Sequence, residues 1–92
     1  MTYARRTDQN LELIVVAARK CGFLCYVRND PLGDLDVQLG GIHEVWECKN
    51  AKGRFTDGQE AHRKKGWIIH TIRSVEDVLE RRKRILKGWA QA

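Results

Sequence analysis

Residues 33–49 read GDLDVQLGGIHEVWECK, and this stretch decides the fold of the chain. Over 34–39, polar and apolar residues alternate, which is the period of a β-strand with one buried face. Gly40 and Gly41 then offer a two-residue turn into a second strand over 42–49. We therefore predict a β-hairpin at the centre of the chain.

The turn also predicts the register of this hairpin. If the two glycines are the central turn residues, Asp34 lies directly opposite Glu47. Asp36 then faces Val45 on the same side of the sheet. Lys49 shares that side with Glu47, because strand side chains alternate between faces. Two acids and a base are therefore expected on one patch of sheet.

One helix and one strand are predicted before the hairpin. Residues 9–21 carry apolar side chains at helical spacing, with Asp8 as the N-cap and Gly22 just past the end. Residues 23–28 are rich in aromatic and β-branched residues, and 29–31 read Asn-Asp-Pro. This pattern predicts a strand followed by a loop.

A helix, a strand and a second helix are predicted after the hairpin. Thr56 and Gln59 match a capping box, and Gly66 closes the short helix that follows. Residues 67–72 predict a buried strand that returns through this helical crossover and runs parallel to a strand of the hairpin. Ser74 caps a last helix. Its apolar stripe comprises Val75, Val78, Leu79, Ile85, Leu86 and Trp89.

The predicted fold class is therefore α/β, with the element order α-β-β-β-α-β-α. We expect a single domain over residues 1–92, built as a four-stranded mixed sheet flanked by helices. A chain of 92 residues has the size of one small domain, which excludes an enzyme with separate substrate and cofactor domains.

Composition limits the kinds of binding partner and the cellular compartment that we expect for the protein. Seventeen Lys and Arg oppose twelve Asp and Glu, and the net charge of +5 suits a polyanionic partner. The longest apolar run, 13–18, is far shorter than the roughly 20 residues of a membrane helix. The start of the chain lacks a signal-peptide pattern, so we expect a cytoplasmic protein without a membrane partner. Cys21, Cys25 and Cys48 form no Cys-x-x-Cys pair, which argues against disulfides and zinc.

The converging acids predict a metal site. Two carboxylates a few ångströms apart repel each other unless a cation neutralises them. Mg²⁺ takes oxygen ligands and commonly uses one or two protein carboxylates plus substrate phosphate, so Asp34 and Glu47 are candidate ligands. Lys49 is a candidate for holding a phosphate oxygen or orienting the nucleophile. Hydrolysis of nucleic acid is the reaction that this set implies.

Each candidate also has a purely structural explanation. Alternating acids and lysines are common on a solvated strand face. Gln59 suits the third position of a capping box for the backbone alone, and Glu12 is typical of a solvated helix residue. The basic runs 63–65 and 81–84 are typical of exposed faces, although either is able to contact phosphates.

The run Glu47-x-Lys49-x-x-Lys52-Gly53-Arg54-x-Thr56-x-x-Gln59, preceded by Gly33-Asp34-Leu35-Asp36-Val37, resembles the VRR-NUC (viral replication and repair nuclease) family of the PD-(D/E)XK superfamily. The resemblance extends from about Asp8 to Leu79. It implies a restriction-endonuclease-like fold and a nuclease dependent on Mg²⁺ or Mn²⁺. It also implies action on branched or structured DNA, similar to that of the Holliday junction resolvases of phages and bacteria, which are often dimeric.

Residue by residue, the resemblance places the catalytic set at Asp34, Glu47, Lys49 and Gln59. The implied metal ligands are Asp34, Glu47 and the backbone carbonyl of Cys48, with Asp36 and Glu12 as further candidates. The candidate DNA-binding residues are Lys52, Arg54, Arg63, Lys64 and Lys65.

The motif departs from the family pattern at two positions. Gly33 precedes Asp34 where the family usually has proline, and Asp36 stands where an apolar residue is usual. An alignment on Gly-x-x-Asp selects Asp36 as the metal-binding aspartate, whereas the hairpin register favours Asp34.

We therefore expect a metal-dependent DNA endonuclease that hydrolyses phosphodiesters in branched or structured DNA. The alternatives are a non-catalytic DNA-binding or assembly module on the same fold and an RNA-directed nuclease. A homodimer is expected, because symmetric branched substrates call for paired active sites.

Overall fold

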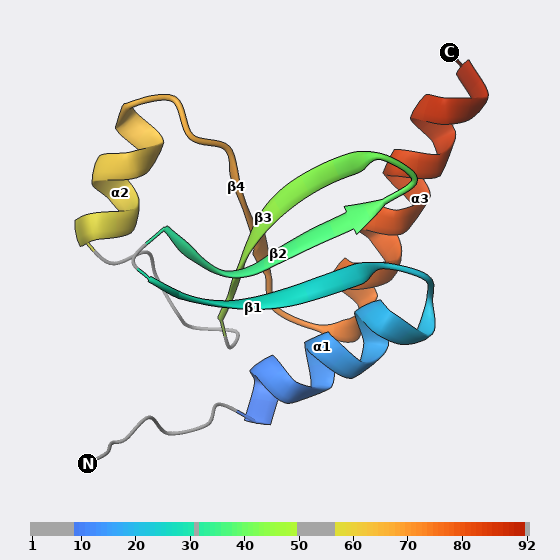
Figure 1. The fold of residues 1–92 in the computed structure, drawn as a ribbon, viewed down its shortest axis with the longest axis horizontal. Coiled ribbons are helices and arrows are strands. Elements are labelled where there is room, and N and C mark those ends of the chain that lie inside the picture. Colours follow the sequence, from blue (N-terminus) through green and yellow to red (C-terminus); the bar gives the residue numbers. More distant parts are fainter. Residues whose placement is uncertain (1–8, 31, 50–56, 92) are drawn as a thin grey trace.

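A computed structural model of the chain describes residues 9–30, 32–49 and 57–91. Seven elements follow one another in the predicted order (Figure 1). They are α1 (Gln9–Lys20), β1 (Leu24–Asp30), β2 (Gly33–Leu39), β3 (Ile42–Cys48), α2 (Asp57–Lys64), β4 (Ile69–Ile72) and α3 (Val75–Gln91). The predicted α-β-β-β-α-β-α order is confirmed.

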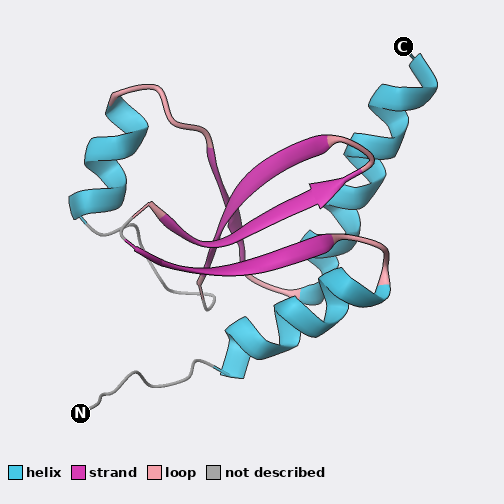
Figure 2. Ribbon diagram, in the orientation of Figure 1, coloured by secondary structure: helices cyan, strands magenta, loops and turns pink. Residues whose placement is uncertain are grey.

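The four strands form one mixed sheet in the order β1-β2-β3-β4 (Figure 2). β2 pairs antiparallel with both β1 and β3, and β4 pairs parallel with β3. A parallel neighbour requires a crossover, and α2 lies in that connection. The predicted α/β fold class is therefore correct, and β3 lies inside the sheet with a partner on each side.

The two-glycine turn sets the hairpin register as expected. Gly40 and Gly41 have φ angles of 55° and 86°, the left-handed values that a tight hairpin turn requires. Asp36 is paired with Val45, and Leu35 is paired with Trp46. The same register, continued by one residue, brings Asp34 opposite Glu47.

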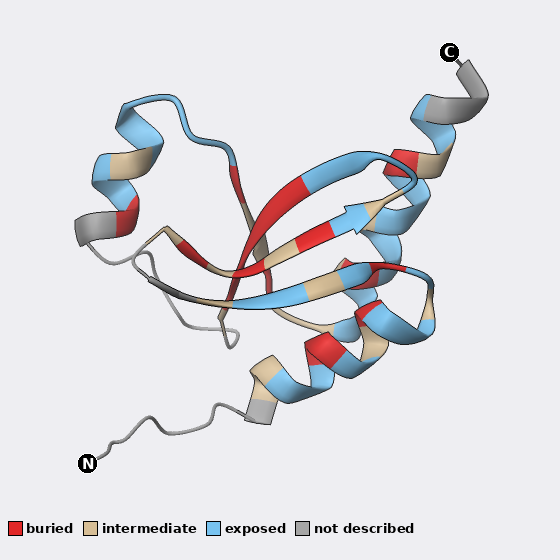
Figure 3. Ribbon diagram, in the orientation of Figure 1, coloured by how far each residue is buried: buried red, intermediate tan, exposed pale blue. Residues whose placement is uncertain are grey.

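Helices α1 and α3 contact each other and pack on one face of the sheet, whereas α2 stands apart at the other end (Figure 1). The buried core joins residues of both helices to every second residue of the central strands, and Ile14, Leu35, Trp46 and Val78 are fully buried (Figure 3). Phe23 meets Trp46 edge to face, with ring centroids 5.0 Å apart. Asp34 and Glu47 therefore lie on the opposite face of the sheet, away from this core.

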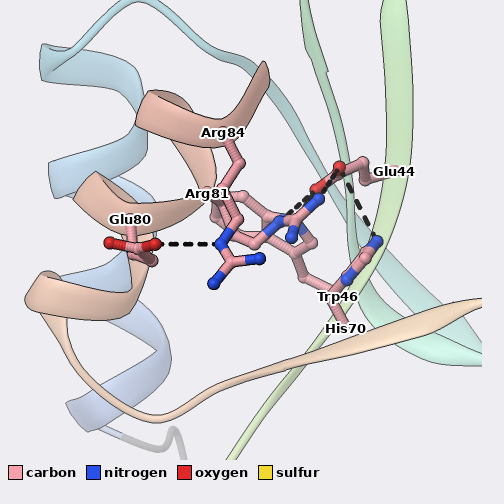
Figure 4. A network of polar contacts seen from close by, with 6 residues as sticks. All are labelled: Glu44, Trp46, His70, Glu80, Arg81 and Arg84. Atoms are coloured by element: carbon pink, nitrogen blue, oxygen red, sulfur yellow. Dashed lines mark hydrogen bonds and ion pairs between the residues drawn. The ribbon is translucent and has the colours of Figure 1, made fainter. Parts of the chain in front are cut away.

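A buried ionic contact fastens α3 to β3 (Figure 4). Arg81 donates from Nε to Glu44 Oε1 at 3.1 Å and from a terminal nitrogen to Oε2, and Trp46 Nε1 donates to Oε1 at 2.9 Å. His70 Nε2 lies 3.6 Å from Oε2. Burial alone would raise the pKa of Glu44, but the hydrogen bonds from Arg81 and Trp46 outweigh it and lower the pKa.

Two expectations about apolar residues are wrong. The strand predicted over 67–72 begins only at Ile69, and the side chains of Trp67 and Ile68 are 54% and 72% exposed. In α3, Val78 and Ile85 are buried as expected, but Val75 and Leu79 are exposed. Among the described residues, no helix has the length and apolar character needed to span a membrane.

Candidate functional site

Asp34 and Glu47 meet at the ends of two neighbouring strands. Asp34 is the second residue of β2, and its Oδ2 accepts a hydrogen bond from the backbone N–H of Cys48 at 2.8 Å. Glu47 precedes Cys48 in β3 and is only 3% exposed. The carboxylate of Asp34 is therefore held by the backbone of β3, the strand that carries Glu47.

Lys49 completes this group, which we call the acid–lysine cluster: Asp34, Glu47 and Lys49. The Lys49 Nζ atom lies 3.1 Å from Glu47 Oε2, and both side chains are largely withdrawn from solvent. The backbone N–H of Lys49 donates to the carbonyl of Ile72, which extends the pairing with β4 past the end of β3. The structure thus brings together the three residues that the hairpin register places on one patch.

The environment of the cluster opposes the ionisation of Asp34. Burial raises the pKa of this carboxyl to about 6, and the neighbouring carboxylate of Glu47 adds to the increase. The hydrogen bond from Cys48 N–H and the charge of Lys49 act in the opposite direction but do not cancel it. The charge of one lysine therefore does not compensate a buried and a partly buried acid side by side, and a further cation would be stabilised here.

One carboxylate oxygen of the cluster has no hydrogen-bond donor among the described residues. Glu47 Oε1 is buried and accepts no hydrogen bond from the described residues, although buried carboxylate oxygens are usually paired. Those residues contain no group of three His, Cys, Asp or Glu side chains suited to a metal. Mg²⁺ commonly takes only one or two protein carboxylates, so Asp34 and Glu47, with the Cys48 carbonyl beside them, fit such an ion.

Asp36 has different partners from Asp34. Arg28 donates to both of its carboxylate oxygens, at 3.0 and 2.8 Å. His43 Nε2 also lies 2.8 Å from Oδ1. The carboxylate of Asp36 is therefore already compensated by a guanidinium, whereas that of Asp34 faces another acid.

Glu12 and Gln59 are placed differently with respect to the cluster. Glu12 is exposed on α1. It lies about 200° around the helix from Asn10, the residue that contacts the end of β3. The structure therefore does not bring Glu12 to the acids. Gln59 is buried in the first turn of α2, while Glu60, which follows it, is exposed.

The glycine before the motif aspartate has a steric explanation. A Cβ atom at position 33 would lie 2.7 Å from Val45 Cγ1 and 3.2 Å from the carbonyl oxygen of Trp46. At these distances the Val45 side chain or the backbone beside it would have to shift. Glycine at position 33 therefore matches a close approach of the two strands that carry the acids.

Two residues near the cluster were not identified from the sequence. Asn10 Nδ2 donates to the carbonyl of Lys49 at 2.8 Å and to that of Arg73 at 3.4 Å, which ties the start of α1 to the ends of β3 and β4. Thr71 is paired with Glu47 across the parallel strands and shares its face. Neither belongs to a motif, and only the register of β3 and β4 reveals Thr71.

The predicted basic residues fall into two groups. Lys52 and Arg54 lie outside the described residues. Arg63, Lys64 and Lys65 are exposed at the end of α2, where Arg63 lies 3.6 Å from Glu60. The structure therefore shows an exposed basic group that follows the acid–lysine cluster in the crossover to β4.

A comparison of the chain with protein-family models, curated proteins and solved structures finds no match.

Proposed function

We propose that the protein is a metal-dependent nuclease that hydrolyses DNA phosphodiesters at the acid–lysine cluster. The observation that carries the proposal is a pair of carboxylates on neighbouring strands: Asp34, which is partly buried and has a raised pKa, and Glu47, which is buried and has an oxygen lacking a described partner. If their role were purely structural, two adjacent carboxylates with only one lysine beside them would lower the stability of the fold. A site for a divalent cation accounts for that cost.

The residues of the acid–lysine cluster have different roles in this proposal. Asp34 and Glu47 would hold the ion, with the carbonyl of Cys48 next to them. Bound there, Mg²⁺ or Mn²⁺ would activate water and stabilise the charge that develops on the phosphate. The ammonium of Lys49 lies beside Glu47, and it would hold a phosphate oxygen or orient the attacking water. The hydrogen bond from Cys48 holds Asp34 in position.

The substrate class rests on charge and on the motif resemblance. The net charge of +5 and the basic end of α2 suit a nucleic acid. The preference for branched DNA, of the kind that Holliday junction resolvases cut, rests on the VRR-NUC resemblance of the motif residues alone. We include a cytoplasmic location in the proposal. The three cysteines form no disulfide, and both this and action on DNA suit the cytoplasm.

The test is a cleavage assay with Mg²⁺ on matched linear, flap and four-way-junction DNA. Glu47→Ala and Lys49→Ala should each abolish cleavage and leave DNA binding intact, because Glu47 would hold the ion, Lys49 would act on the phosphate or the water, and both side chains lie outside the helix-packed core. Glu80→Ala removes an exposed acid from α3 and serves as the control. Matched RNA substrates form a second arm of the assay.

The outcomes separate the candidate functions. Full activity of purified Glu47→Ala would refute the nuclease assignment. Tight DNA binding with no cleavage by the wild type in Mg²⁺ or Mn²⁺ would favour the non-catalytic DNA-binding or assembly module. Faster cleavage of the RNA substrates would reassign the nucleic acid.

A further inference from the structure

The end of α2 holds a tryptophan out toward solvent. The Trp67 N–H donates to the carbonyl of His62, and the Gly66 N–H donates to that of Arg63, which is the Schellman pattern that ends a helix. Gly66 adopts a φ of 107°, as this pattern requires. The chain joins the sheet only at Ile69, so the large ring of Trp67 is left 54% exposed.

Trp67 lines an open pocket of about 460 Å³, which we call the Trp67 pocket. Arg63 and Lys64 line it from α2, and Ile68 and Ile69 line it from the strand side. Glu60 is also part of the wall and lies 3.6 Å from Arg63. The pocket therefore combines one exposed aromatic face with two cations against a single acid.

From this arrangement we infer that the Trp67 pocket binds an unpaired DNA nucleotide, with the base stacked on Trp67 and the phosphates near Arg63 and Lys64. An exposed aromatic side chain beside Lys and Arg is the combination by which proteins hold single strands, because every base offers a face for stacking. The inference rests on the proposed function for its choice of DNA. It deepens that function by specifying a substrate with an unpaired segment.

The pocket lies within reach of the acid–lysine cluster along β4. Thr71 is paired with Glu47, and Trp67 precedes Thr71 by four residues. At about 3.3 Å per residue, the two levels are at most about 13 Å apart along the strand direction. This is roughly four steps of stacked bases at about 3.4 Å each. A nucleotide in the pocket would therefore belong to the DNA that is being cut.

A second exposed aromatic residue lies on the other edge of the sheet and is the natural competitor. Tyr26 on β1 is 71% exposed and lines a cavity of about 290 Å³. Asp36 and His43 line that cavity, and no lysine or arginine of the described part of the chain does so. Its charge suits a DNA phosphate less well than that of the Trp67 pocket, so Tyr26 provides the matched control.

The test is binding with cleavage prevented by Ca²⁺ in place of Mg²⁺. Fluorescence anisotropy would compare oligo(dT) of about ten nucleotides, the same backbone without bases, and a paired duplex. Trp67→Ala should weaken binding of oligo(dT) about tenfold and change binding of the duplex and the abasic strand by less than about twofold. Trp67→Phe should retain most of the affinity, and Tyr26→Ala should bind like the wild type. Unchanged melting temperatures would show that all three variants fold.

Two results would overturn the inference. The first is oligo(dT) binding by Trp67→Ala that equals that of the wild type, and the second is an equal loss on the abasic strand. A base-dependent loss in Tyr26→Ala alone would move the site to β1 and also refute it. Stronger base-dependent binding of oligo(U) would overturn the choice of DNA. Because the assay does not need cleavage, an inactive wild type with base-dependent binding refutes only the nuclease, and active cleavage with no effect of Trp67→Ala refutes only the pocket.

Discussion

The affinity of the acid–lysine cluster for Mg²⁺ should fall steeply in mild acid. Because a proton and a metal ion compete for the same carboxylate, binding follows the ionised fraction of Asp34. With a pKa of about 6, that fraction falls about tenfold between pH 7 and pH 5. A carboxyl at its ordinary value of 3.8 would change by less than about a tenth over the same range.

Calorimetric titration with Mg²⁺ at several pH values between about 5 and 8 measures this dependence. Asp34→Asn should weaken binding at neutral pH and flatten the pH profile. Asp36→Asn removes a carboxylate from the same strand and face, but one that is bound to Arg28 and His43. It should therefore keep the profile of the wild type. A flat profile in the wild type, or an Asp36→Asn variant that behaves as predicted for Asp34→Asn, would refute the reasoning.

The same pKa shift acts on the stability of the metal-free protein. Because the folded pKa of Asp34 lies above the ordinary value, folding favours the protonated form, and its stabilisation is lost as the pH rises through about 6. Asp34→Asn should therefore raise the melting temperature of the metal-free protein more at pH 7.5 than at pH 4, where Asp34 is almost wholly protonated in the folded protein. Equal shifts at both pH values would contradict this sign.

Three further predictions concern the rest of the molecule. Arg81→Met leaves the buried Glu44 carboxylate without its guanidinium and should cost about 3 kcal/mol in urea unfolding, and a loss below about 1 kcal/mol would mean that the contact is exchangeable with water. DNA binding in Ca²⁺ should weaken by more than about tenfold between roughly 50 and 200 mM salt, because phosphate contacts dominate it, and a change below about threefold would contradict this. Light scattering at tens of micromolar should give the mass of a homodimer, and a monomer that still cuts junctions would contradict paired active sites.

Local patterns were sufficient to predict the hairpin and the placement of the cluster. A two-glycine turn has few allowed geometries, so Gly40 and Gly41 determine which residues of β2 and β3 face each other. The alternation along both strands then assigns Asp34 and Glu47 to the same face. These signals span fewer than twenty residues, which is why they could be interpreted without knowledge of the tertiary structure.

Features that depend on distant residues could not be predicted in this way. Glu44 and Arg81 are 37 residues apart, and each on its own resembles a solvated charge. Trp67 and Ile68 continue the apolar run of β4, but the crossover reaches β3 only at Ile69. Hydrophobicity alone cannot distinguish a buried strand from exposed residues that precede it. The contact of Asn10 with the ends of β3 and β4 likewise requires the packing of α1.

The pairing of β3 on both of its edges affects which parts of the molecule open locally and which tolerate substitution. Amide hydrogens in a strand bonded on both sides exchange with solvent chiefly when the whole domain unfolds, whereas those of an exposed element such as α2 exchange through local opening. Glu47 is carried by the first kind of element and Trp67 adjoins the second. Under the proposed function, substitutions around α2 would alter the choice of substrate while the acids stay rigid, so specificity could diverge among descendants of this chain without loss of the proposed chemistry.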